Sequence, residues 1–121
     1  MGLFDYVKIN YDLPTPNTAT EKHVEFIKNA IDTEEFQTKD LDCVLNKFCL
    51  DKDGYLYEQN EGKYEKRYVH QHVFCYTSIK MLFEDISYWL EYNIKFTDGK
   101  VKDVTIEQWY PIIKKKSINF N

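Results

Sequence analysis

The chain has 121 residues, of which 43% are hydrophobic and 30% charged, with a formal net charge of −4. This length and composition predict a single folded domain over residues 1–121 and exclude an intrinsically disordered chain. Residues 1–61 hold 13 acidic against 6 basic residues, which argues against a general binder of duplex DNA. The only basic cluster, Lys114-Lys115-Lys116, is typical of a solvated tail.

Cysteine usage and hydropathy indicate a soluble protein of the cytoplasm. Cys43, Cys49 and Cys75 are odd in number and lack CxxC spacing, so we expect free thiols in a reducing compartment. No apolar segment follows Met1, and no run approaches the ~20 apolar residues of a membrane span. We therefore expect no contact with a membrane.

The first predicted elements are a strand and a helix. Apolar and polar residues alternate over Phe4–Tyr11, which predicts a half-buried strand. Pro14 ends it, because proline lacks the backbone donor that a ladder needs. Thr20 can then cap an amphipathic helix over residues 21–32, whose apolar stripe includes Ile27.

Residues 35–59 predict a leading loop, a strand, a tight turn and a returning strand. From Cys43 to Leu50 apolar residues recur at every second position, apart from Asn46, which is the period of a strand. Asp53-Gly54 is a strong hairpin signal, because glycine accepts the positive φ that such turns need. The β-prone residues 55–57 then resume the sheet.

The second half predicts a polar loop followed by a meander of three strands. We expect the loop over Glu58–Arg67. The strands are expected over Tyr68–Phe83, Tyr88–Thr97 and Val101–Trp109, joined by turns at Glu84-Asp85 and Asp98-Gly99. In the middle strand, Leu90, Tyr92, Ile94 and Phe96 fall in the inward phase and Trp89 in the outward phase.

These elements predict an α+β fold. It is a β-rich antiparallel sheet built from hairpins and a meander, with one short amphipathic helix covering one face. The aromatic content of 17% agrees, because aromatic side chains favour pleated surfaces over helices. An exposed edge strand of such a sheet can pair two copies, so a homodimer is also considered.

Several motifs resemble a family of small phage and prophage proteins of unassigned function. The matching stretches are Gly2–Val7, Leu13-Pro14, Phe36–Cys43, Asp53–Leu56, Trp89–Tyr92 and Phe96–Val101. Thr15–Glu35 departs from the family, whose members often have a shorter connection there. The resemblance implies a viral accessory protein in the host-cell cytoplasm. It supplies no reaction, cofactor or catalytic residue.

His70 and His72 are the clearest candidate metal ligands. On a strand they share a face, about 7 Å apart. A zinc site would need a third ligand, such as His23, Cys43 or Cys49. The alternative is two partly exposed histidines beside a polar loop, and on that reading we expect no metal and no cofactor.

Other catalytic or metal-binding patterns are weak. Asp51–Gly54 with Glu58 has its glycine fourth and its glutamate eighth, whereas an EF-hand loop needs them sixth and twelfth. A nucleophilic Cys43 or Cys49 would lie within a strand pattern that buries one of them. The chain's four glycines form no phosphate-binding loop. We therefore expect that the protein is not an enzyme.

The polar cluster Gln37–Asp40 has two interpretations. Polar residues in a loop before a buried strand can serve binding. Alternatively, Thr38 and Asp40 hydrogen-bond the local backbone and fix the start of the hairpin. The residues that we predict to contact a partner are Gln37, Thr38, Lys39, Asp40, Tyr55, Tyr57 and Trp89.

Three functions follow from these patterns. The first is protein binding by a viral accessory factor that blocks a host enzyme or an antiviral defence complex, since aromatic side chains dominate binding hot spots. The second is a small binding module for single-stranded nucleic acid or a nucleotide, in which tyrosines stack on bases. Its residues would be Tyr55, Tyr57, Tyr64, Tyr68, Lys63, Lys66 and Arg67. The third is a metal-dependent enzyme built on the His70–His72 pair.

Overall fold

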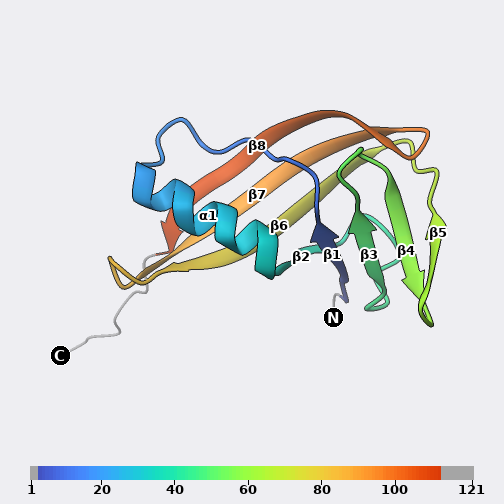
Figure 1. The fold of residues 1–121 in the computed structure, drawn as a ribbon, viewed down its shortest axis with the longest axis horizontal. Helices are drawn as coiled ribbons and strands as arrows, with labels where there is room; N and C mark the ends of the chain where they lie inside the picture. Colours follow the sequence, from blue (N-terminus) through green and yellow to red (C-terminus); the bar gives the residue numbers. More distant parts are fainter. Residues whose placement is uncertain (1–2, 113–121) are drawn as a thin grey trace.

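The computed structural model of the protein describes residues 3–112, so the tail cluster Lys114–Lys116 lies outside the described residues. The elements are β1 (Asp5–Ile9), α1 (Glu21–Thr33), β2 (Glu35–Thr38), β3 (Lys47–Leu50), β4 (Leu56–Asn60), β5 (Lys63–Lys66), β6 (His72–Met81), β7 (Ile86–Thr97) and β8 (Lys100–Ile112). The strands form one eight-stranded sheet in the order β5-β4-β3-β1-β2-β6-β7-β8, with α1 on one face (Figure 1). The predicted β-rich α+β class is confirmed at this level. Within residues 3–112, no helix is long and apolar enough to span a membrane.

The position of β1 distinguishes this sheet from a series of hairpins. β2 pairs with β1 antiparallel, whereas β3 pairs with β1 parallel. β1 is therefore inserted between two strands that follow each other in the sequence. The connection over residues 39–46 must pass around the N-terminal end of β1 to reach β3.

The carboxylate of Asp5 holds this connection in place. Its oxygens accept backbone N–H groups at 2.6–3.1 Å from Asp42, Cys43, Val44 and Asn46. The Asp5 side chain is fully buried. A buried carboxylate is stable only when its lone pairs are satisfied, and here the loop backbone satisfies them.

The Asp5 hydrogen bonds also explain why the strand predicted over Cys43–Leu50 is wrong at its start. Cys43 and Leu45 take positive φ values of 59° and 62°, which a strand cannot contain. Val44, expected in the buried phase, is 56% exposed. Only Lys47–Leu50 is extended.

The leading loop predicted before that strand is also wrong, because it contains β2. Phe36 and Thr38 of β2 are buried while Gln37 is only half-buried, which is the alternation of a strand with one face in the core. At four residues, β2 is too short for its period to stand out from the polar residues that follow it.

The polar stretch Glu58–Arg67 forms a hairpin rather than the predicted loop. β4 and β5 pair antiparallel on either side of Glu61-Gly62, where both residues have positive φ, 50° and 80°. This is the conformation of a type I′ turn. Every residue of β5 is exposed, so the hairpin lacks the apolar alternation that reveals a strand.

The three meander strands are confirmed with shifted ends. β6 begins at His72 rather than Tyr68, and β7 begins two residues before the predicted Tyr88. β8 continues past the predicted end and includes Pro111, which pairs with Tyr88. An edge strand tolerates proline, because the N–H on its free side has no partner to lose.

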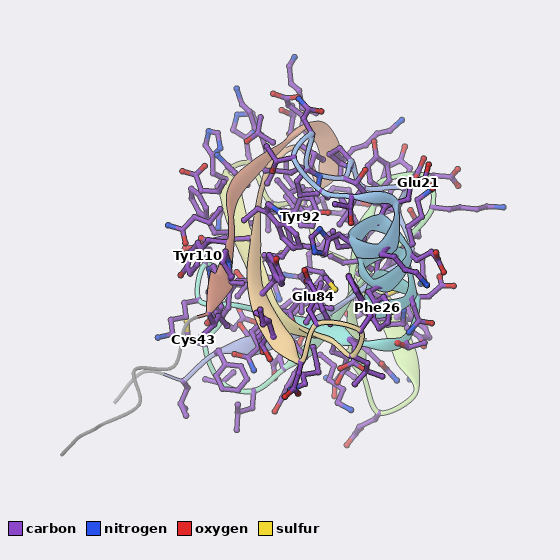
Figure 2. All side chains as sticks on the ribbon, turned by 90° about the vertical axis from the view of Figure 1, so that its left-hand side faces the viewer. Glu21, Phe26, Cys43, Glu84, Tyr92 and Tyr110 are labelled. Atoms are coloured by element: carbon purple, nitrogen blue, oxygen red, sulfur yellow. The ribbon has the colours of Figure 1, made fainter. Side chains whose placement is uncertain are left out.

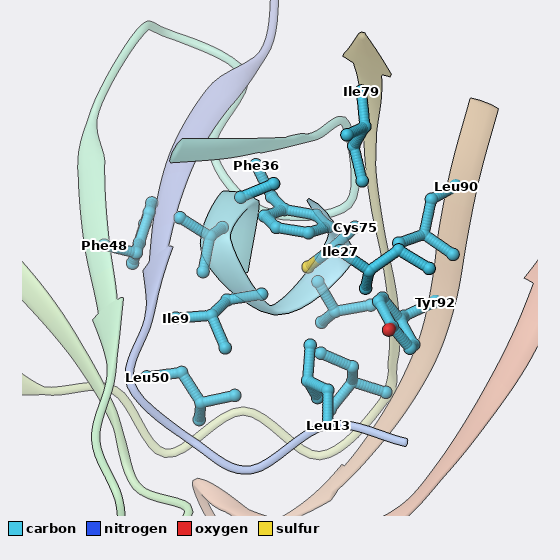
Figure 3. Packing of buried hydrophobic residues seen from close by; sticks show 14 of the residues in the cluster. Ile9, Leu13, Ile27, Phe36, Phe48, Leu50, Cys75, Ile79, Leu90 and Tyr92 are labelled. Carbon is cyan, nitrogen blue, oxygen red and sulfur yellow. The ribbon is translucent and has the colours of Figure 1, made fainter. Parts of the chain in front are cut away.

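The buried side chains lie on the face that α1 covers. Leu90, Tyr92, Ile94 and Phe96 are all buried, as predicted from their phase. Figure 3 shows Ile9 and Leu50 from one half of the sheet facing Leu90 and Tyr92 from the other half. Ile27 of α1 is fully buried in the same cluster, so the helix closes the core.

The sheet coils so that β4 and β8 meet at one end. The Leu56 N–H donates to the Gly99 carbonyl at 3.1 Å, and the Val101 N–H donates to the Gly54 carbonyl at 2.8 Å. The two Asp-Gly turns that the sequence predicts separately therefore lie against each other. We call this contact the seam.

Replacing Asp5 by alanine is expected to destabilise the fold by about 3–5 kcal/mol, because a buried N–H without a partner costs ~1–3 kcal/mol. Urea unfolding followed by circular dichroism measures the loss. Asp12→Ala, at an exposed position shortly after β1, is the control and should change stability by less than about 0.5 kcal/mol. Equal stability of the two variants would contradict the role given to Asp5.

Two glycines allow a matched test of how closely the Asp98-Gly99 turn packs against the backbone of Arg67 and Tyr68. Gly99 and Gly62 have φ values of +81° and +80°, but a Cβ at Gly99 would lie 2.6 Å from the Arg67 carbonyl oxygen, whereas a Cβ at Gly62 meets nothing within 4 Å. In both alanine variants the left-handed backbone lowers the free energy of unfolding by about 1–2 kcal/mol. Only Gly99→Ala also introduces a clash with the Arg67 carbonyl, so it should be less stable than Gly62→Ala by about 1–3 kcal/mol in urea unfolding. Indistinguishable midpoints would contradict a close contact between Gly99 and the Arg67 carbonyl.

Candidate binding surface on the outer face of the sheet

The sheet face turned away from α1, which we call the outer face, carries two neighbouring rows of side chains. Cross-strand pairing over β2, β6, β7 and β8 places one row at Gln37, Tyr76, Glu91 and Gln108. The second row is Ser78, Trp89 and Tyr110. Adjacent strands lie about 4.8 Å apart, so the rows form a continuous surface. We call these residues the outer-face patch; Figure 2 shows Tyr110 on the side away from α1.

A stacked aromatic pair lies at the centre of the outer-face patch. The rings of Tyr76 and Trp89 have centroids 5.1 Å apart and planes 25° apart. The Trp89 indole N–H donates to the Glu91 carboxylate at 3.3 Å. Tyr110, the cross-strand neighbour of Trp89, is 45% exposed. The pair is thus oriented in advance, while aromatic surface beside it remains open to solvent.

The phenol of Tyr76 lies in a negative environment. Its pKa is raised first by burial and then by the carboxylates of Glu91 and Asp40. Asp40 is fixed nearby, because its Oδ2 accepts the Phe74 N–H at 2.7 Å. The outer-face patch therefore combines a flat aromatic surface with two carboxylates.

The structure brings together only some of the residues predicted to contact a partner. Gln37 and Trp89 lie in the outer-face patch, and Asp40 lies beside it. Lys39 is exposed on the adjoining loop. Thr38 is fully buried and its Oγ1 accepts the Asp40 N–H at 3.2 Å, so the structural interpretation holds for Thr38, which cannot touch a partner.

Tyr55 and Tyr57 lie away from the outer-face patch. Tyr57 belongs to β4, which β3, β1 and β2 separate from β6. Tyr55 lies at the seam, where Lys66 and Lys100 place their Nζ atoms 4.1 and 5.2 Å from the ring centroid. These lysines already occupy the π surface of Tyr55.

Five residues of the outer-face patch were not among the predicted contacts: Tyr76, Ser78, Glu91, Gln108 and Tyr110. Strand alternation gives a signal for two of them. Glu91 lies between Leu90 and Tyr92, which are predicted core, and Tyr76 follows Cys75, which is in the inward phase of its strand. No such signal exists for Gln108, since the ladder shifts by one residue between Glu91 and Tyr92.

The candidate metal ligands do not converge. His70 precedes β6, so the pair does not share a strand, and the Nδ1 of His72 lies 2.8 Å from the Asn93 Oδ1. No group of three or more His, Cys, Asp or Glu within residues 3–112 is placed to hold a metal ion. Asp51 Oδ1 accepts the N–H groups of Asp53 and Tyr55, which is turn chemistry.

His23 is the histidine with a carboxylate partner, but both of its ring nitrogens are engaged. Nδ1 accepts the Thr20 N–H at 3.2 Å as part of the capping box of α1. Nε2 must then carry the proton, and it donates to Glu84 at 2.9 Å. The lone pair of His23 thus accepts a backbone N–H, which has no proton to give up in catalysis, and the His23–Glu84 pair fixes the helix to the β6–β7 turn.

The cysteines are free, as expected, but they are not placed as nucleophiles. Cys75 is buried, and burial raises the pKa of its thiol well above the ordinary range, so the reactive thiolate is suppressed. The half-buried Cys43 donates its S–H to the Lys39 carbonyl at 3.0 Å, and the Cys49 sulfur accepts from Asn10 at 3.3 Å.

Arg67, a predicted nucleic-acid contact, is neutralised by two carboxylates. Its guanidinium donates twice to Asp42 at 3.0 Å and once to Glu58 at 2.7 Å. The hydrogen bonds from Arg67 hold the pKa of Asp42 below its ordinary value. This group links the connection around β1 to the seam rather than facing a ligand.

No protein-family model, curated protein or solved structure matches the chain. The resemblance to small phage proteins therefore stays a prediction. The geometry of the outer-face patch is the basis for a proposed function.

Asp42→Asn tests the Arg67 group. Because Arg67 lowers the pKa of Asp42 in the folded state, the ionised carboxylate stabilises the fold above the unfolded pKa, near 3.9. At neutral pH the variant should lose about 1 kcal/mol, a modest value because the pair is partly exposed. The difference from wild type should shrink as the pH falls below about 3.9, through the lowered folded pKa. Urea unfolding of both proteins at neutral pH and below about pH 3.9 measures this difference in stability. Asp103→Asn, at an exposed position of β8, is the control and should change stability by less than about 0.5 kcal/mol at neutral pH.

Proposed function

We propose that the protein is a small phage-encoded accessory factor of the host cytoplasm that acts by binding a host protein through the outer-face patch. The partner in this proposal is a host enzyme or an antiviral defence complex. The observation that carries the proposal is the Tyr76–Trp89 stack on the outer face, with Tyr110 exposed beside it.

A pre-oriented aromatic pair favours protein binding for an energetic reason. Trp and Tyr contribute most of the energy in many interfaces, since they bury a large area with few rotatable bonds. Here the indole is already held by Tyr76 and by its hydrogen bond to Glu91, so little side-chain entropy remains to be lost on binding. Gln37, Gln108 and Glu91 supply the polar groups that surround such anchors.

Within residues 3–112, the helix and the buried cluster lie on the inner face of the sheet, opposite the Tyr76–Trp89 stack. α1 packs against β6 and β1 on the inner face, and the buried cluster is complete there. Aromatic side chains gathered on the opposite face are typical of an interaction site. The homodimer expected from an exposed edge strand would pair along β8, the last strand of the sheet, and it stays a prediction.

Binding of single-stranded nucleic acid is the second candidate function. Tyr64 and Tyr68 are 59% and 72% exposed, and the exposed Lys63 and Lys66 lie on β5 with Tyr64. Bases could stack on these rings. Against this candidate, Lys66 is already placed over Tyr55 and Arg67 is paired with two carboxylates.

The test is affinity purification of tagged protein from infected host cells, with mass spectrometry and nucleic-acid detection on the same eluate. One stoichiometric host protein is expected. Trp89→Ala should weaken its binding by at least about 30-fold, the loss expected for a hot-spot residue. Tyr64→Ala, an exposed aromatic residue on β5, is the matched control and should retain the partner.

Two outcomes would overturn the proposal. Retention of the partner by a folded Trp89→Ala variant would place the interface elsewhere. Nucleic acid without a host protein, bound more weakly as salt rises and lost in Tyr64→Ala, would favour the second candidate.

A further inference from the structure

We infer that the outer-face patch is built to receive a guanidinium group, so that the partner presents an arginine to the Tyr76–Trp89 stack beside Glu91 and Asp40. This inference rests on the proposed function, because it names the chemistry of the ligand at the same site. It predicts that the partner surface is basic at its centre.

The geometry provides the two features that arginine recognition needs. A guanidinium stacks on a flat π surface and donates in its own plane to a carboxylate. The stacked rings of Tyr76 and Trp89 supply the surface. Glu91 supplies the carboxylate, since it is the direct cross-strand neighbour of Tyr76 on β7.

The carboxylates retain acceptor capacity. Glu91 receives the Trp89 indole N–H on Oε1, and Asp40 receives the Phe74 N–H on Oδ2. Within residues 3–112, their second oxygens accept no hydrogen bond from the protein. Each can therefore accept a donor from a ligand while the existing bond keeps it in place.

The local charge favours a cation. After burial, the carboxylates of Glu91 and Asp40 contribute most to the raised pKa of Tyr76, so the surroundings of its phenol are negative. The whole chain has a net charge of −4, so a basic partner is also attracted at longer range.

The same geometry favours arginine over lysine. An ammonium is a compact, strongly hydrated charge that gains little from a broad ring surface. A guanidinium is planar and less strongly hydrated, so it can stack and donate at the same time. Selectivity between the two cations is therefore the property that separates a built site from general attraction to an acidic protein.

The experiment follows the fluorescence of Trp89 as an oligo-arginine peptide is added to the full chain. The chain has two tryptophans, so Trp109→Phe leaves Trp89 as the sole reporter. We expect a saturable change in Trp89 emission, and an oligo-lysine peptide of the same length should bind several-fold more weakly.

Two variants that lose the same charge provide the matched comparison. Glu91→Gln should weaken arginine-peptide binding by about tenfold, as expected for a lost charge-assisted hydrogen bond. Glu65→Gln, at an exposed position of β5 on the other side of the sheet, should weaken it by less than about twofold. Because Trp109 stacks on Tyr88, Trp109→Phe can disturb folding. The NMR signal of the Trp89 indole N–H in the chain with both tryptophans then provides the same readout.

Equal binding of arginine and lysine peptides, equal effects of the two Gln variants, or no response at Trp89 would each overturn the inference. If a host protein were still captured in a Trp89-dependent manner, the proposed function would stand without the arginine site. Arginine-selective binding without any captured host protein would instead contradict the proposed function and leave the site chemistry intact.

Discussion

The buried carboxylate of Asp5 determines how the two halves of the sheet are joined. Its hydrogen bonds to the backbone of residues 42–46 force the chain around the end of β1, so that β3 can run parallel to it. Without them, four partly buried N–H groups of this connection would lose their protein partner. The Asp5 side chain thus holds the connection that leads to β3, while the β1–β3 ladder and the seam between β4 and β8 tie the two halves of the sheet together.

The site and the core use opposite faces of the same strands. In β7, Leu90 and Tyr92 enter the buried cluster, while Trp89 and Glu91 form part of the outer-face patch. Strand alternation thus transmits the rigidity of the core to the aromatic pair, and α1 contributes indirectly by packing on the inner face. A site placed on strands in this way is held more firmly than one built from loops.

The meander, the helix and both Asp-Gly turns can be predicted from local sequence patterns, because each depends on residues close in sequence. The inward phase of β7 can be assigned from alternation alone. The path around β1 cannot be assigned in this way. The hydrogen bonds that define it join Asp5 to Asp42 and Asn46, which are separated from it by 37 and 41 positions in the sequence. Alternation likewise places Trp89 on the outward side, but its contact with Tyr76 depends on the register between β6 and β7, which the sequence does not state. The exposed hairpin of β4 and β5 has no apolar alternation to reveal it.

The central place of β1 also has a consequence for how the chain folds. β1 is made first, but its neighbours β2 and β3 lie some 30 to 40 residues later in the chain. The β3–β5 hairpins and the β6–β8 meander depend on local contacts and can form early, whereas inserting β1 between β2 and β3 closes long loops. From this topology we expect the pairing of β1 with β2 and β3 to be the slow step of folding, because it closes the longest loops.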